Sequence, residues 1–382
     1  MDRRHGYRAA RLFTGDQVMA PGTVVLNGPV IEWVGGGVPP MPVRLEDLGD
    51  ATLLPGLIDA HSHVSIDPAA GDQIGQLRRS ADARLASARL RLPIDLASGV
   101  TTMRVMGEED GVDLQIAQEI ASGALAGPDL ICAGVQIARE GHHGHALTGV
   151  SGEAGITLLA RGNVSRGARA LKIFATGGIS SSGTADAAPF TAAEIACAAA
   201  VAREHGVPLA AHAHGGAGLR HAIEGGVDTI EHAAALDDAS LDRILARGLM
   251  VVGTFSILYH PDGIARGDAA NPEIVTKLRA ARETMERSWR AIVASGARIA
   301  VGTDSMHGRL AFDIARLVDF GATPQTALTA ATIGGAEACG LTDRGRLAPG
   351  LRADVVAVHG DPFTDISCLV EPRLVIANGH VR

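Results

Sequence analysis

The chain has 382 residues, a length that fits a full-size α/β barrel with one modest addition. Its composition is 46% hydrophobic but only 3% aromatic, so small aliphatic side chains must fill the interior, which suits parallel strands buried on both faces. The formal net charge is −8, without a Lys- or Arg-rich run, which argues against a nucleic-acid partner. No apolar stretch is long enough to span a bilayer, and no signal-peptide core follows the N-terminal arginines. We therefore expect a soluble, cytoplasmic protein that does not bind membranes.

Lysine is rare in this chain. It occurs only at Lys172 and Lys277, while arginine supplies the rest of the basic charge. A chain that uses arginine almost everywhere can keep a lysine where only an amine will serve. The four cysteines are scattered without a CxxC pair, which predicts small buried thiols in a reducing compartment.

In chain order, residues 1–50 come first and contain short apolar runs broken by Gly and Pro, which predict short antiparallel strands. From there to residue 345, apolar runs alternate with longer amphipathic stretches, the pattern of repeated βα units. The expected strands of this part are Leu53–Ala60, Thr101–Met106, Leu130–Ile137, Leu171–Ala175, Leu209–Ala213, Thr229–Ala233, Met250–Phe255 and Ile299–Gly302. The expected helices include Asp72–Arg91, Ala192–His205, Leu219–Gly225, Leu241–Arg247, Pro272–Ser295 and Pro324–Ala338. Residues 346–382 again contain short strands separated by turn residues.

This organisation predicts an α/β fold of the (β/α)₈ TIM-barrel class with a small β-sandwich domain. Eight parallel strands are what a closed barrel requires, and residues 51–345 supply them. Neither terminal segment alone has enough strands to bury a face. We therefore expect residues 1–50 and 346–382 to form one composite small β domain beside the barrel.

Polar side chains close several of the expected strands, where the catalytic groups of an α/β barrel lie. The first strand ends in His61-Ser62-His63, and residues two apart in an extended chain point to the same side, so both imidazoles can address one metal. The fourth strand contains Lys172. Further candidates are His212 and His214 in the fifth strand, His232 in the sixth and Asp304 after the eighth.

Each of these residues has an ordinary explanation when it is taken alone. A strand-end histidine can be a satisfied core side chain or face solvent, and Asp304 could cap the next helix. Lys172 could form a buried ion pair with a carboxylate. Because these residues occur at the ends of successive expected strands, a metal site is favoured over these alternatives.

Several segments resemble a known family across nearly the whole chain. LLPGLIDAHSHV at the first strand, GTDS at the eighth and GRLAPGLRADVVAVHGDPFTD near the C-terminus resemble the amidohydrolase superfamily in its lysine-bridged binuclear subtype. ALKIFATGGISS, AHAHG and TIEHA are similar to the imidazolonepropionase-like branch, which includes Xaa-Pro dipeptidases and related carboxypeptidases. The resemblance implies a binuclear metal site at the barrel mouth.

The resemblance also implies a role for each candidate ligand. His61 and His63 with Asp304 would hold the more buried metal, His212 and His232 would hold the more exposed one, and Lys172 would bridge them. An ammonium cannot bind a cation, but burial in an apolar strand lowers the pKa of lysine, and its neutral amine can take up carbon dioxide to form a bridging carbamate. Zinc suits these ligands best, and manganese, cobalt and iron are also compatible with them.

Such a site predicts a metal-dependent hydrolase that cleaves an amide bond of a small molecule, either an N-acyl amino acid, a dipeptide or a cyclic amide. Two metals would share a hydroxide, lower its pKa and polarise the scissile carbonyl. Asp304 would take the proton of the attacking water and deliver it to the leaving group. No Ser or Cys nucleophile is required.

A histidine-rich loop after the third strand, GHHGH at residues 141–145, is expected over the site, although a solvated loop is the alternative. It resembles a GGHG loop of the dipeptidase branch, in which His143 matches the family's histidine and His142 replaces a glycine. His214 stands where that branch commonly has a tyrosine, so Xaa-Pro specificity is in doubt. Further candidates to line the substrate site are Tyr259, His260, His307 and Arg309. Arg139 or Arg309 could pair with a substrate carboxylate.

The sequence leaves several alternatives open. The same site could act on a lactone, an ester or a carbamate, or follow a mononuclear deaminase-like path. Some members of the superfamily have lost ligands and serve as scaffolds, but no ligand position is missing here. A Rossmann-type nucleotide enzyme is disfavoured because GGG at 35–37 lacks the GxGxxG spacing. The substrate, the metal and the oligomeric state, a homo-oligomer included, are not fixed by any motif.

Overall fold

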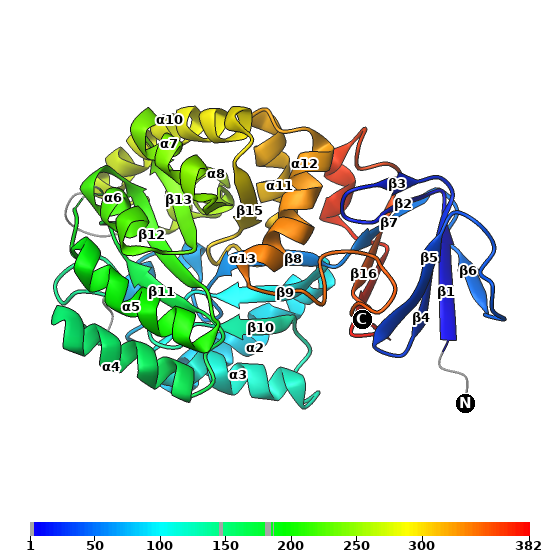
Figure 1. Ribbon diagram of the computed structural model, residues 1–382, viewed down its shortest axis with the longest axis horizontal. Coiled ribbons are helices and arrows are strands. Elements are labelled where there is room, and N and C mark those ends of the chain that lie inside the picture. The colour runs from blue at the N-terminus through cyan, green and yellow to red at the C-terminus, as the bar shows by residue number, and fades with distance from the viewer. Residues whose placement is uncertain (1–3, 145–147, 180–184, 186) are drawn as a thin grey trace.

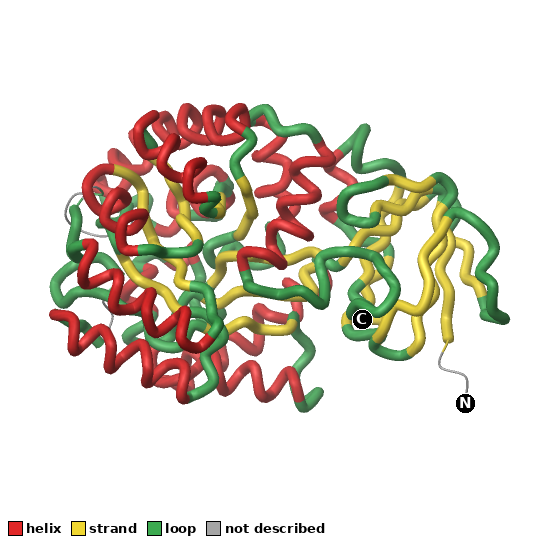
Figure 2. Tube along the Cα trace, viewed as in Figure 1, coloured by secondary structure: helices red, strands yellow, loops and turns green. Residues whose placement is uncertain are grey.

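The computed structural model describes residues 4–144, 148–179, 185 and 187–382. A large α/β body contains most of the chain, and a smaller part made of strands lies at one side of it (Figures 1 and 2). The first described strand and the C-terminal end of the chain lie at the smaller part (Figure 1). None of the described helices is long and apolar enough to cross a lipid bilayer.

The α/β body contains parallel strands that lie side by side in the order of the sequence. One sheet holds β8 (Leu57–Ser62), β9 (Val100–Val105) and β10 (Asp129–Cys132), and the next holds β11 (Leu171–Phe174), β12 (Leu209–Gly215), β13 (Thr229–Ala235), β14 (Met250–Thr254) and β15 (Arg298–Gly302). A backbone bridge between Ile137 and Ile173 joins the two sheets beyond β10. At the other side, the Asp304 N–H donates to the His61 carbonyl (2.8 Å), where β15 meets β8. The prediction of an α/β fold built on parallel strands is confirmed.

Helices cover the outside of these strands and follow local capping rules. Helix α5 (Ala192–His205) begins behind Thr191, which forms a reciprocal capping box with Glu194, and it ends at Gly206 with φ +66°. Its bounds and those of α10 (Pro272–Ser295) are the expected ones. The other described helices are α1 (Gln73–Gln76), α2 (Ala81–Ala97), α3 (Val112–Ala121), α4 (Gly152–Ser165), α6 (Gly216–Gly225), α7 (Asp238–Arg247), α8 (Ser256–Tyr259), α9 (Ile264–Gly267), α11 (Leu310–Asp319), α12 (Pro324–Thr329) and α13 (Gly335–Ala338), with a π-helical turn η3 (Ala330–Gly334) and short 3₁₀ turns η1 (Pro68–Ala70), η2 (Glu109–Gly111) and η4 (Ile366–Val370). The single helix expected at Asp72–Arg91 is two helices, because Ser80 caps a new one.

The first expected strand, Leu53–Ala60, is also divided. Strand β7 (Ala51–Pro55) pairs with β16 (Val355–His359) in the smaller part, and only β8 belongs to the α/β body. Gly56 makes the transition: its N–H donates to the Asp354 carbonyl (2.9 Å), and a Cβ there would lie 2.1 Å from Thr101 Oγ1. The close approach of these segments therefore requires glycine at the junction.

The smaller part contains two sheets built from both ends of the chain. The first sheet has the order β5-β4-β1-β6, made of β5 (Val30–Gly35), β4 (Gly22–Asn27), β1 (Arg4–Ala9) and β6 (Leu45–Asp47). The second has the order β18-β17-β16-β7-β2-β3, with β18 (His380–Val381), β17 (Leu374–Ala377), β2 (Arg11–Phe13) and β3 (Val18–Met19). A hydrophobic cluster separate from that of the α/β body includes Tyr7, Leu26, Leu53, Val355 and Ile376, so N- and C-terminal residues share one core.

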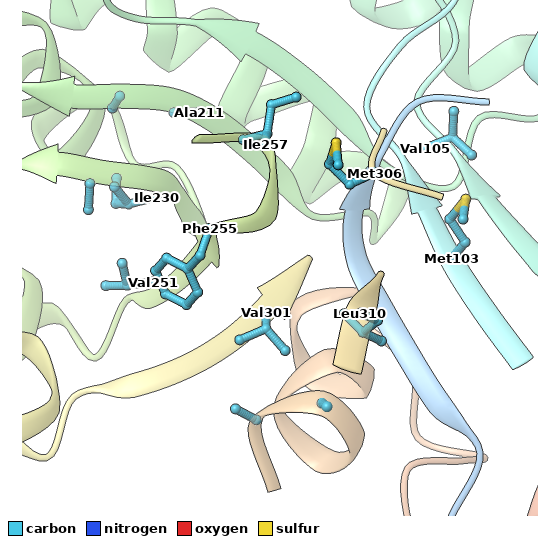
Figure 3. Packing of buried hydrophobic residues seen from close by; sticks show 14 of the residues in the cluster. Met103, Val105, Ala211, Ile230, Val251, Phe255, Ile257, Val301, Met306 and Leu310 are labelled. Atoms are coloured by element: carbon cyan, nitrogen blue, oxygen red, sulfur yellow. The ribbon is translucent and has the colours of Figure 1, made fainter. Parts of the chain in front are cut away.

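A larger hydrophobic cluster fills the α/β body. Figure 3 shows part of it, including Met103 of β9, Val251 of β14 and Val301 of β15. Behind β14, Trp289 of α10 is fully buried and meets Phe255 edge to face, with ring centroids 4.8 Å apart. This packing holds the strands from whose carboxyl ends the polar candidates project.

Candidate metal centre

A cavity lies at the carboxyl ends of the parallel strands, with about 690 Å³ of empty space including its open mouth. Its lining includes all of the residues expected at the metal centre: His61, His63, Lys172, His212, His232 and Asp304. These side chains come from β8, β11, β12, β13 and the turn after β15, so the fold brings them together from distant parts of the chain.

The two histidines of β8 are each held by one ring nitrogen. His61 Nδ1 donates to Glu231 Oε2 at 2.6 Å, and His63 Nδ1 donates to the Gly107 carbonyl at 3.1 Å. Both Nε2 atoms then face Asp304, whose Oδ1 lies 3.5 Å from that of His61 and 3.7 Å from that of His63. Burial lowers the pKa of His63 to about 4, so its ring is neutral.

The histidines of β12 and β13 are also each held by one ring nitrogen, but with different partners. His212 Nε2 donates to the Gly177 carbonyl at 3.0 Å, and His232 Nδ1 is hydrogen-bonded to Thr254 Oγ1 at 2.7 Å. His232 has φ +73°, and the indole N–H of Trp289 donates to its carbonyl (2.9 Å). Burial lowers the pKa of both imidazoles well below the usual value, so both rings are neutral, the form that binds metals.

This donor arrangement fits divalent cations. In each of the four histidines one nitrogen is bonded to the protein and the other is left for a ligand, the arrangement that orients metal-binding imidazoles. Ligand atoms of His61, His232 and Asp304 all lie within 4.8 Å of one another. Asp304 has φ +49°, a conformation that non-glycine residues adopt rarely and that recurs at functional sites.

Lys172 lies inside the cluster and is only 1% exposed. Burial lowers the pKa of its amine to about 8, although the charges of Glu231 and Asp304 oppose the shift. Its Nζ lies 5.2 Å from the centre of the Phe174 ring. An amine with such a pKa has a larger neutral fraction near neutral pH than an ordinary lysine, and the neutral amine is the form that reacts with carbon dioxide.

A buried network beneath the cluster was not predicted from the sequence. Arg104 Nη2 donates to Glu231 Oε1 at 3.0 Å, while Nε donates to the Ala60 carbonyl at 2.6 Å and Nη1 to that of Ala338 at 2.9 Å. Arg104 and Glu231 are both fully buried. The sequence carries a weak signal of both: Arg104 interrupts an apolar strand, and Glu231 directly precedes His232 in TIEHA.

Asp59 is a second support that the sequence did not reveal. Its Oδ1 accepts from the backbone N–H of His61 and of Thr303, both at 3.1 Å, and its Oδ2 accepts from Thr303 Oγ1 at 2.6 Å. Asp59 therefore ties the end of β8 to the turn that carries Asp304.

The histidine candidates for substrate binding occupy different places. His143 and His214 line the cavity, and the ring centroid of His143 lies 4.7 Å from that of His212. His214 Nδ1 is buried without a hydrogen-bond partner in the described structure. His142 is exposed and is not part of the described lining. Residues 145–147 of the same loop lie outside the described residues.

The remaining candidates are bonded elsewhere and are not among the described lining residues. The Tyr259 hydroxyl donates to the Arg282 carbonyl at 2.7 Å. His307 Nδ1 is hydrogen-bonded to Asp95 Oδ2 at 2.7 Å, and both side chains are buried. Arg309 is half-exposed and lies 3.9 Å from the Asp262 carboxylate.

His260 and Arg139, the other two candidates, also lie outside the described lining. Arg139 forms an ion pair with Glu194, and His260 lies 3.8 Å from the Asp262 carboxylate. The structure thus brings the expected metal ligands together but places most of the expected substrate contacts away from the cavity.

Comparison with known proteins agrees with the resemblance of the sequence to the amidohydrolase superfamily. The family model described as "Amidohydrolase family" matches residues 52–382. Ochratoxinase of Aspergillus niger is 27% identical over 363 residues, which covers 85% of this chain and 73% of that protein. Imidazolonepropionase of Cereibacter sphaeroides is 26% identical over 413 residues, which covers 98% of this chain and 97% of that protein. A crystal structure of a Xaa-Pro dipeptidase with bound methionine in the active site is 28% identical, has a TM-score of 0.89 and covers 99% of both chains.

Proposed function

The chain belongs to the amidohydrolase family, as predicted, and from this premise we propose that it is a two-metal hydrolase that cleaves the amide bond of an N-acyl amino acid, a dipeptide or a cyclic amide. The family and its enzyme relatives establish a hydrolase that acts on carbon–nitrogen bonds and has the TIM-barrel α/β fold. The observation that carries the proposal is that each of four clustered histidines is fixed by one ring nitrogen and keeps the other for a ligand.

We assign the metal ligands as six residues: His61, His63, Lys172, His212, His232 and Asp304. Zinc is the metal that these ligand types suit best. Lys172 would carry a carbamate formed with carbon dioxide and would so become a carboxylate-like bridge, which its burial and lowered pKa support. Bound divalent metals would supply an activated water and a Lewis acid for the substrate carbonyl.

The protein's own residues would hold and move the proton. Asp304 is only partly covered, with a side chain 22% exposed, while the neighbouring His61 is 1% exposed. A carboxylate in this position can accept a proton from the attacking water and return it to the leaving nitrogen. The left-handed backbone at Asp304 and the Asp59 contacts to Thr303 would hold its oxygens in place during both transfers.

We further propose that the barrel closes between β15 and β8 and that residues 1–50 and 346–382 form one β-sandwich domain beside it. The backbone hydrogen bond from Asp304 to His61 supports the closure. The hydrophobic cluster shared by Tyr7, Leu53 and Ile376 supports the composite domain.

The two lysines provide the experiment, because Lys277 is a matched control for Lys172. Lys277 lies on α10 and pairs with Glu273 at 2.7 Å, away from the cavity. We expect Lys172→Ala to lose hydrolysis and part of the bound metal, and to regain activity with added short-chain carboxylic acids, while Lys277→Ala keeps both. Carbon-13-labelled bicarbonate should give a carbamate NMR signal in the wild type and in Lys277→Ala only. Two metals and full activity in Lys172→Ala would overturn the proposed bridge.

A further inference from the structure

One wall of the cavity is formed by apolar side chains from two separate segments. Ile66, Ile74 and Leu77 follow β8, and Ile257 and Ile264 follow β14; all five line the cavity. We call these five residues the apolar roof. Ile66 and Leu77 form a small hydrophobic cluster of their own, apart from the cluster that fills the α/β body. Ile257 and Ile264, by contrast, belong to the cluster that fills the α/β body and line the cavity from its edge.

The two segments of the roof are in direct contact with each other. A Cβ at Gly71 would lie 2.3 Å from the Gly267 carbonyl oxygen, and a Cβ at Gly267 would lie 2.0 Å from the carbonyl oxygen of Pro68. The Asp72 N–H also donates to Asp268 Oδ1 at 3.1 Å. Strand β15 pairs with β14, and the Asp304 N–H that follows β15 donates to the His61 carbonyl of β8, so the two segments follow strands that both contact the β15 region. The two segments of the roof therefore pack directly against each other.

The charges of the cavity are confined to the metal centre. Within the described lining, Asp304 is the only carboxylate and Lys172 is the only lysine or arginine. A substrate carboxylate away from the metals would therefore find no cationic side chain in this lining, and burying an unpaired charge is costly.

Neutral polar atoms are present instead and lack partners. Gln73 Nε2 and Gln136 Oε1 are buried without a hydrogen-bond partner in the described structure, and both residues line the cavity. The two residues are 7% and 1% exposed, respectively. One atom is a donor and the other an acceptor, so together they complement an uncharged group such as an amide. Buried polar atoms without a protein partner at a cavity can bond to a ligand or to water.

We propose that the substrate is an uncharged amide that carries a bulky apolar group, with that group packed under the apolar roof and with no free carboxylate near the scissile bond. This inference rests on the proposed amide hydrolysis and replaces the N-acyl amino acid and the dipeptide with an amide that lacks their carboxylate. It assigns specificity to the roof and to Gln73 and Gln136.

A matched set of amides tests the inference on the metal-loaded protein. N-acetyl-phenethylamine and N-acetyl-phenylalanine differ only by the carboxylate, and N-methylacetamide lacks the apolar group. We expect kcat/KM for the phenethylamine amide to exceed that for each of the others by roughly tenfold or more. An equal or higher value for the free acid or for N-methylacetamide would overturn the inference and leave the proposed function intact.

Binding separates failure of the inference from failure of the proposed function. Inactivity of the metal-loaded protein toward these and all other amides would count against the proposed function. The dissociation constants of the same three compounds, measured by calorimetry, then decide the inference, which requires the uncharged phenethylamine amide to bind most tightly.

A charge-introducing variant provides an independent test. Ile74 is only partly buried, so the long side chain of Ile74→Arg can be accommodated. We expect this variant to shift the kcat/KM ratio toward N-acetyl-phenylalanine by roughly tenfold, because the guanidinium would pair with the carboxylate. Leu158→Arg on α4 is the control, since Leu158 is 76% exposed, and it should leave the ratio unchanged. A folded Ile74→Arg protein with an unchanged ratio would argue against a substrate group under the roof.

Discussion

Glu231 Oε2 lies 2.6 Å from Nδ1 of His61, and both side chains are buried. Because Arg104 donates to the same carboxylate, a continuous chain of hydrogen bonds runs from the barrel interior to a candidate metal ligand. A carboxylate behind a metal-binding imidazole fixes the ring and its tautomer and raises the basicity of the free nitrogen. Buried residues beneath the cavity therefore orient a residue of the candidate metal centre.

Replacing this carboxylate should weaken metal binding. Glu231→Gln keeps the shape of the side chain but removes the negative charge that holds His61, so we expect metal affinity to fall by roughly 10- to 100-fold. Competition with a chromophoric chelator measures the affinity directly. Glu224→Gln is the control, because Glu224 forms a surface ion pair with Arg243 on neighbouring helices. Equal affinities in the two variants would show that Glu231 does not support the site.

The ion pairs Arg104–Glu231 and Arg243–Glu224 also allow a test of stability. Both have N–O distances of 3.0 Å, but the first is buried and the second is half-exposed. Arg104→Met leaves the buried Glu231 carboxylate without its arginine partner, and we expect the free energy of unfolding to fall by about 3–5 kcal/mol. Arg243→Met should cost less than about 1 kcal/mol, because that pair is half-exposed. Urea unfolding of the two variants gives both values. Similar losses would mean that the buried pair is not a distinct stabilising element.

The sequence was sufficient to predict the parallel strands and the cluster of metal-ligand candidates, because both depend on local pattern. His61, His232 and Asp304 each follow or end an apolar run, and strand ends of one barrel face the same side. Helix α10 was predicted to the residue because Asn271, Pro272 and Gly296 mark its ends.

The contacts that join distant segments could not be predicted in this way. Asp59 bonds to Thr303, and Arg104 bonds to Glu231, across more than a hundred residues of sequence. Tyr259 follows its strand as expected, but its hydroxyl donates to Arg282 rather than reaching the cavity, because side-chain direction in a short helix is set by packing. The apolar roof was missed for the same reason: its residues carry no motif, and only the fold brings them together.

The junction of the roof should tolerate no added methyl group. Gly267→Ala would place its Cβ 2.0 Å from the Pro68 carbonyl oxygen, so the two segments must separate. We expect a loss of about 1–3 kcal/mol in the free energy of unfolding, and a raised KM for bulky apolar amides with little change in bound metal. Gly162→Ala in α4 is the control, since a Cβ there meets nothing within 4 Å, and an alanine in a helix should stabilise it by about 0.5–1 kcal/mol. Unchanged stability and KM in Gly267→Ala would mean that the two segments are not in close contact in the protein.

Metal removal should expose the contribution of the histidines to stability, independently of catalysis. A ligand that binds only the folded protein stabilises it by about 2.7 kcal/mol when its concentration is 100 times the dissociation constant. We therefore expect chelation to lower the melting temperature and added zinc to restore it. His212→Ala and His221→Ala provide a matched pair, because each imidazole donates to a backbone carbonyl, at 3.0 Å and 2.9 Å respectively, but only His212 lines the cavity. His212→Ala should lose much of the zinc-dependent rise in melting temperature, whereas His221→Ala should keep it. The same zinc response in both variants would exclude His212 from the metal site. The assignment of His212 and His232 to one metal would then also be wrong.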